Sequence, residues 1–145
     1  MPEITTRVLI NIFLATGALF ALWKGGAPER ATAGVVIFNV IVGQTFHELA
    51  PQFDPIVRLV NDGVSALALL TITLRYGALW MGGVMLFFAA QFSLHSYYMV
   101  MNRPQTDRLH AIINNVDWSG IAWCLIIGAA VAWRRRVRAL RKPAA

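Results

Sequence analysis

Five long apolar stretches follow one another along the chain, and short segments with charged residues, glycine or proline separate them. An α-helix rises about 1.5 Å per residue, so about 20 residues cover the roughly 30 Å hydrocarbon layer of a membrane. The pattern therefore predicts an all-α fold, namely a polytopic membrane helical bundle with five transmembrane helices. The expected spans are residues 8–23, 30–49, 56–74, 78–101 and 109–133.

Glycine, proline and a carboxylate mark the expected ends of the spans. Gly25 and Gly26 follow the first span. Pro28 suits the first turn of the second helix, because its fixed φ angle fits a helix and the missing N–H has no intrahelical partner there. Asp54 precedes Pro55 and is expected to be the N-cap of the third helix, since its carboxylate can accept hydrogen bonds from free N–H groups of the first turn.

The third stretch is the one whose crossing is in question, because Arg58, Asn61 and Asp62 occupy its first two turns. Its uncharged part, residues 63–74, covers only about 18 Å, which is less than the roughly 30 Å of hydrocarbon. Since Arg58 and Asp62 are four residues apart on one helical face, we expect them to pair and so to lower the cost of burial. A bundle of four spans, with residues 56–74 as a re-entrant or interfacial helix, is the alternative.

The composition also places the chain in a membrane, since 57% hydrophobic and only 14% charged residues are too apolar for an ordinary soluble domain. We expect one domain, the bundle of residues 1–133, followed by a basic tail at 134–145. Positive residues beside a span are retained in the cytoplasm, so the tail predicts a cytoplasmic C-terminus. Contact with anionic lipid headgroups, rather than with nucleic acid, is expected for Arg134, Arg135, Arg136, Arg138, Arg141 and Lys142.

The distribution of positive charge does not separate the two arrangements of spans. With five spans, nine Lys and Arg residues lie inside and four outside, and with four spans the counts are the same. The two arrangements differ in the side of the membrane on which the loop at Pro28 lies.

Polar side chains gather near one end of four of the five spans, and in the five-span arrangement these ends all lie in the outer leaflet. Within the third, fourth and fifth spans they are separated by three, four or seven residues, which places them on one helical face. Asp62 is expected to lie across from His95. The predicted cluster contains Arg58, Asp62, Gln91, His95, Asn114 and Asp117, with His47, Glu48 and His110 as peripheral candidates near the interface.

Unpaired polar groups in hydrocarbon cost several kcal/mol each, so these stripes should face one another or a wet cavity that opens to the outer side. Their structural role would be hydrogen bonding between helices, and their functional role the binding of a small ligand. A complete proton path is not expected, because the inner halves of the spans hold few polar residues. No catalytic residue, metal site or cofactor is predicted, since H-E-x-x-H and C-x-x-C spacings are absent and Cys124 is the single cysteine.

Short motifs are spread over most of the length: W-K-G-G-A-P-E-R at residues 23–30, Asp62 with Leu74-Arg75, Trp80 with Gln91 and His95, and R-R-R at residues 134–136. With these motifs the chain resembles an uncharacterised group of short polytopic inner-membrane proteins of Gram-negative bacteria. The resemblance implies a helical bundle in the bacterial inner membrane. It implies no activity, and the positions that match its pattern are Asp62, Arg75, Gln91 and His95.

The function expected from the sequence is that of a non-enzymatic inner-membrane protein with a polar cluster in the outer leaflet. Such a protein would bind a small ligand or act as an accessory to a larger membrane complex or to further copies of itself, with membrane lipids around it. Two other classes remain as alternatives. One is a phage-type holin or other pore-forming protein, suggested by the short chain and basic tail, and the other is a small haem- or metal-binding membrane enzyme.

Overall fold

The computed structural model describes residues 2–104 and 107–141, with side chains from residue 5 onward. The described residues form five α-helices and contain no strand, so the predicted all-α fold is confirmed, and each expected span coincides with one helix. A single 3₁₀ turn, η1 (Pro51–Phe53), joins the second helix to the third. The helices are α1 (Pro2–Lys24), α2 (Ala27–Leu49), α3 (Asp54–Tyr76), α4 (Leu79–Val100) and α5 (Arg108–Arg141).

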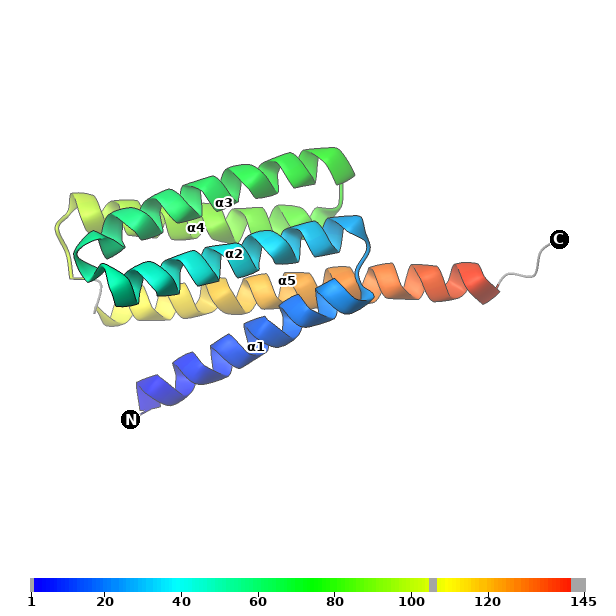
Figure 1. The fold of residues 1–145 in the computed structure, drawn as a ribbon, viewed down its shortest axis with the longest axis horizontal. Coiled ribbons are helices and arrows are strands. Elements are labelled where there is room, and N and C mark those ends of the chain that lie inside the picture. Colours follow the sequence, from blue (N-terminus) through cyan, green and yellow to red (C-terminus); the bar gives the residue numbers. More distant parts are fainter. Residues whose placement is uncertain (1, 105–106, 142–145) are drawn as a thin grey trace.

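Helices α2, α3, α4 and α5 run side by side, and each packs against the next in the chain (Figure 1). Helix α1 lies obliquely across α5, and its N-terminal half diverges from α2. The two ends of the bundle therefore differ. One holds the turns α1–α2 and α3–α4, and the other holds the connections α2–α3 and α4–α5.

The tight turn between α1 and α2 depends on glycine. A Cβ atom on Gly25 would lie 2.1 Å from the carbonyl oxygen of Ala21, so a side chain does not fit there. The N–H of Gly26 donates to Glu29 Oε2 at 2.7 Å, which closes a capping box at the start of α2. The chain can therefore reverse direction within two residues.

Asp54 is the first residue of α3, and Phe53 takes the N-cap position, so the predicted cap at Asp54 is wrong by one residue. The reason is that η1 continues almost directly into α3 and Asp54 already has helical backbone angles. Its carboxylate is then free to bind a side chain one turn further along α3.

Helix α5 continues without a break from the last expected span through the basic segment to Arg141. Its 34 residues extend for about 51 Å, so its C-terminal end projects beyond the other helices (Figure 1). Arg136 donates a hydrogen bond to the backbone carbonyl of Lys24 and so caps the C-terminal end of α1. Lys142, also predicted to contact lipid headgroups, lies outside the described residues.

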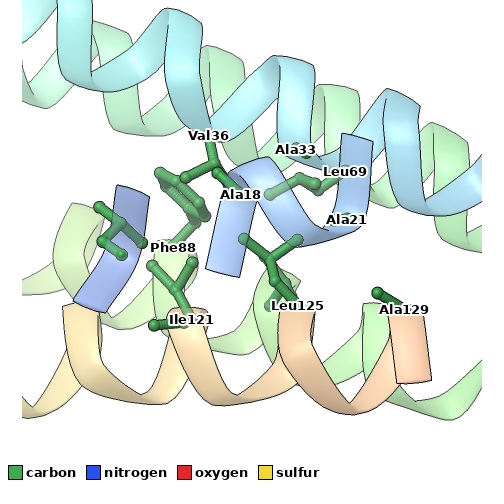
Figure 2. Close-up of a cluster of buried hydrophobic side chains, with 12 residues drawn as sticks. Ala18, Ala21, Ala33, Val36, Leu69, Phe88, Ile121, Leu125 and Ala129 are labelled. Atoms are coloured by element: carbon green, nitrogen blue, oxygen red, sulfur yellow. The ribbon is translucent and has the colours of Figure 1, made fainter. Parts of the chain in front are cut away.

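A dry core fills the half of the bundle next to the α1–α2 turn (Figure 2). Small side chains on α1, α2 and α5 let these helices approach one another closely, and larger side chains on α3 and α4 fill the remaining space. The core consists of Leu14, Ala18, Ala21, Ala33, Val36, Leu69, Val84, Phe88, Ile121, Ala122, Leu125 and Ala129.

In the other half, most of the buried side chains are polar and the outer surface is apolar. The buried polar residues there are Asn39, Asp54, Asn61, Asp62, Ser65, Gln91, His95, His110 and Asp117. Large apolar side chains cover the outside of all five helices, for example Leu9, Ile41, Leu67, Leu86 and Ile127. This distribution is the reverse of that in a soluble protein.

Three helices of the described chain are long and apolar enough to cross a membrane. They are α1 from Thr5, α3 with the turn before it (Pro51–Tyr76), and α5. Helix α3 is the span whose polar first turns raised the alternative of a re-entrant helix. Its length and composition meet the requirement for a crossing despite those turns.

We expect Gly120→Leu to lower the free energy of unfolding by about 1–3 kcal/mol, because this is the usual cost of overpacking. A Cβ atom at this position would lie 2.2 Å from the ring of Phe87, which packs on α5 at the glycine. Gly34→Leu is the matched control, since a Cβ atom there meets nothing within 4 Å. Reversible unfolding of both variants in mixed detergent micelles measures the difference, and equal stabilities would contradict the prediction.

Candidate functional site

A buried hydrogen bond joins α3 to α4 in the polar half of the bundle. His95 Nδ1 lies 2.6 Å from Asp62 Oδ2, and the two side chains are only 4% and 5% exposed. A carboxylate only accepts hydrogen bonds, so the imidazole donates from Nδ1. The prediction that Asp62 lies across from His95 is confirmed.

Asn39 of α2 holds the second oxygen of the same carboxylate. Its Nδ2 donates to Asp62 Oδ1 at 3.1 Å and to Ser65 Oγ at 3.0 Å, and its backbone carbonyl accepts from Asn61 Nδ2 at 2.8 Å. Three helices therefore meet at one carboxylate. Asn39 is not among the site residues predicted from the sequence. The available signal was an amide in the middle of an apolar stretch, eight residues before His47 and hence on the same helical face.

Arg58 pairs with Asp54 rather than with Asp62. Its Nε lies 2.9 Å from both carboxylate oxygens of Asp54, and His47 Nδ1 lies 3.4 Å from Asp54 Oδ2. The predicted pair of Arg58 and Asp62 is therefore wrong. Both carboxylates are four residues from Arg58, but Asp54 lies at the loop end of α3, where the arginine remains partly exposed and partly hydrated.

Gln91 and His110 are buried beside the central pair. Gln91, one turn before His95 on α4, is 1% exposed. The ring of His110 lies 5.4 Å from that of His95 and 4.9 Å from that of Tyr98, centroid to centroid. His110 is only 8% exposed, so it belongs to the cluster and not to the solvated periphery where the sequence placed it.

Several buried polar atoms of this cluster have no hydrogen-bond partner within the part of the chain that the structure describes. They are both side-chain polar atoms of Gln91, Nε2 of His95, Nε2 of His110 and Oδ2 of Asp117. An unpaired buried polar atom costs about 1–3 kcal/mol. Because several of these atoms lie in one region, they point to a ligand-binding site.

The connection between α4 and α5 is tied to the cluster through Tyr98. The Tyr98 hydroxyl donates to Asp107 Oδ2 at 2.8 Å, and the N–H of Leu109 approaches Asp107 Oδ1 at 3.3 Å. These hydrogen bonds, that from Tyr98 foremost, lower the pKa of the Asp107 carboxyl below its ordinary value. The start of α5, which carries His110, is thus held beside Tyr98 of α4.

A cavity of about 440 Å³ lies at this end of the bundle and receives side chains from all five helices. Residues of the predicted cluster that line it are Arg58, Asp62, Gln91, His95 and Asn114, and the peripheral candidates His47 and His110 line it too. Asp117 is buried without lining the cavity, and Glu48 is exposed on α2 outside it. The structure thus brings together most, but not all, of the predicted residues.

Comparison with protein-family models, curated proteins and solved structures found no match to this chain. Among the residues at 2–104 and 107–141, no three His, Cys, Asp or Glu side chains gather closely enough to hold a metal ion. The function is therefore inferred from the side chains that line the cavity.

We expect a double-mutant cycle to separate the true pair from the predicted one. Asp62→Leu should cost about 3 kcal/mol, because it leaves buried partners unpaired. Combined with His95→Phe, its effect should fall short of additivity by about 1–2 kcal/mol, whereas combined with Arg58→Leu it should be additive within about 0.5 kcal/mol. Unfolding in mixed micelles provides the free energies, and equal coupling in both cycles would refute the assignment of partners.

Proposed function

We propose that the protein is a non-enzymatic bundle of five membrane-spanning helices that binds a small polar ligand in the cavity lined by Asp62, His95 and Gln91. The bacterial inner membrane is its proposed location, with the C-terminus in the cytoplasm. The observation that carries the proposal is the set of buried polar atoms without partners around a cavity of about 440 Å³. That volume lies within the usual range of ligand sites.

The reversed distribution of polarity supports the membrane assignment. Apolar side chains face outward, and aromatic residues lie at the helix ends, where they suit the membrane interface. At the inner end, Lys24 Nζ lies 3.9 Å from the centre of the Trp23 ring and 5.3 Å from that of Trp133. The arginines of the projecting α5 end are exposed beside them, in place to contact anionic headgroups.

Ligand binding accounts for the cluster better than hydrogen bonding between helices alone. Asn39, Asp62 and His95 do connect three helices, which is the structural role. Gln91, however, is buried between helices and bonds to no described residue with either polar atom, so it contributes no such connection. The packed core around Phe88 and Leu125 closes the cavity toward the inner side, which favours a binding site over a pore.

Labelling of single cysteines in a Cys124→Ser background tests the proposed topology. Glu48→Cys and Arg30→Cys place a thiol at exposed positions at opposite ends of α2. In intact spheroplasts, a membrane-impermeant maleimide should label Glu48→Cys, while Arg30→Cys should react only after lysis. The opposite result, with Arg30→Cys labelled from outside, would refute five spans with a cytoplasmic C-terminus.

Filling the cavity tests ligand binding without removing a polar group. Gly43 lines the cavity, and a Cβ atom there has its nearest neighbour, Asn61 Nδ2, at 4.0 Å, so a larger side chain can occupy the space. Native mass spectrometry of gently extracted protein should find a retained small molecule on the wild type and on the Gly34→Leu control. On Gly43→Leu, the retained molecule should fall at least about tenfold.

Equal retention by both leucine variants, or no retained mass on the wild type, would count against the proposed function. Gly34→Leu is a suitable control because it changes the same helix at a site where nothing lies within 4 Å of the new Cβ atom.

A further inference from the structure

Charge is distributed unevenly between the two ends of the bundle. At the end that holds the α1–α2 and α3–α4 turns, the described carboxylate is Glu29, which is buried and accepts a hydrogen bond from the Gly26 N–H. The basic residues described at this end are Lys24, Arg30, Arg75, Arg134, Arg135, Arg136, Arg138 and Arg141. This end therefore attracts anions and repels cationic groups.

Two of these cations, on different helices, are held beside each other. Arg136 of α5 donates to the backbone carbonyl of Lys24, the last residue of α1. A guanidinium has several N–H groups, so this bond leaves others for an external acceptor. The Lys24 ammonium lies 3.9 Å from the centre of the Trp23 ring and 5.3 Å from that of Trp133. Both cations are therefore already ordered, which lowers the entropy cost of binding an anion.

The apolar side chains next to these two cations are exposed. Trp23 is 72% exposed, and Trp133, Leu19 and Leu22 also face outward. Tryptophan is enriched at the boundary between the hydrocarbon and the headgroups of a membrane. Lys24 and Arg136 therefore lie at headgroup depth in the proposed membrane arrangement, and α1 offers an apolar surface for acyl chains directly beside them.

From these features we infer that Lys24 and Arg136 bind the phosphate of an anionic phospholipid, whose acyl chains lie along α1 and α5 beside Trp23 and Trp133. The phosphate oxygens accept hydrogen bonds from the guanidinium and the ammonium. A zwitterionic phospholipid has the same phosphate, but the surrounding arginines repel its own cationic group. The negative surface potential of the cytoplasmic leaflet reflects a supply of such anionic lipids on the side where this end is proposed to lie.

The distal arginines of α5 lie outside this site. A helix turns about 100° per residue, so Arg138, two residues after Arg136, lies on the opposite face of α5 from α1. Arg134, two residues before Arg136, shares that opposite face. These arginines attract the membrane surface in a diffuse way that salt screens, whereas Lys24 and Arg136 form one defined site.

The inference rests on the part of the proposed function that places the helices in a membrane, and it is independent of the ligand in the cavity. If the wild type showed no lipid preference while the labelling of Glu48→Cys and Arg30→Cys gave the expected topology, only the lipid site would fall.

Native mass spectrometry of the full chain in detergent tests the inference with two lipids that have the same acyl chains, dioleoyl phosphatidylglycerol and dioleoyl phosphatidylcholine. The wild type should bind a first molecule of phosphatidylglycerol about tenfold or more tightly than phosphatidylcholine. Inorganic phosphate at the concentration of the lipid should not displace phosphatidylglycerol, because it has no acyl chains. Equal affinity for the two lipids, or displacement by phosphate, would overturn the inference.

Two double variants separate a defined site from diffuse attraction. Lys24→Gln with Arg136→Gln should lower the preference for phosphatidylglycerol by about fivefold or more. Arg134→Gln with Arg138→Gln is the matched control, because it removes the same charge from the opposite face of α5. The control should change the preference by less than about twofold, since salt screens those charges. An equal loss in both variants would overturn the defined site.

Lys24→Gln alone keeps the inference testable if loss of the bond from Arg136 to α1 prevents folding. It should lower the preference for phosphatidylglycerol by about threefold or more, and an unchanged preference would overturn the role of Lys24. The ratio of the two lipid affinities is the readout, because a merely structural role of these residues would change the binding of both lipids alike.

Discussion

The carboxylate of Asp62 is the point on which the polar half of the bundle depends. It accepts from His95 on α4 and from Asn39 on α2, so a single buried anion fixes the distance and register of three helices. A buried acidic group is tolerated only with such partners.

The division of the bundle into a dry and a polar half follows from the side chains on each helix. Near the α1–α2 turn, alanine, leucine and phenylalanine form most of the core, and the helices approach closely. At the opposite end, amides and imidazoles replace them, and the helices enclose a cavity instead. The cavity therefore occupies the polar half, and the apolar core occupies the half next to the α1–α2 turn.

Helix α5 links the two ends of the molecule. Its first turns carry His110 to the cavity, its centre contributes to the dry core, and its basic end reaches the C-terminus of α1 through Arg136. The helical spacing of Arg134, Arg138 and Arg141 places them on one face of this rigid extension. The positive charges are therefore held in a fixed direction relative to the bundle, which suits contact with a charged surface.

The sequence by itself determined the number of the helices, the approximate position of each, and the polar stripes on α3, α4 and α5, because helical periodicity and apolar length are local properties. It also placed Asp62 opposite His95, since both lie at similar depth in neighbouring antiparallel helices. Only the tertiary structure decided that Arg58 pairs with Asp54, because both carboxylates lie four residues from it along α3. Asp62 is bonded to Asn39 and His95 of neighbouring helices, and Asp54 lies at the loop end of α3. The tertiary structure likewise brought Asn39 and His110 into the site, since their burial depends on how α2 and α5 pack against other helices, and periodicity within one helix carries no information about that packing.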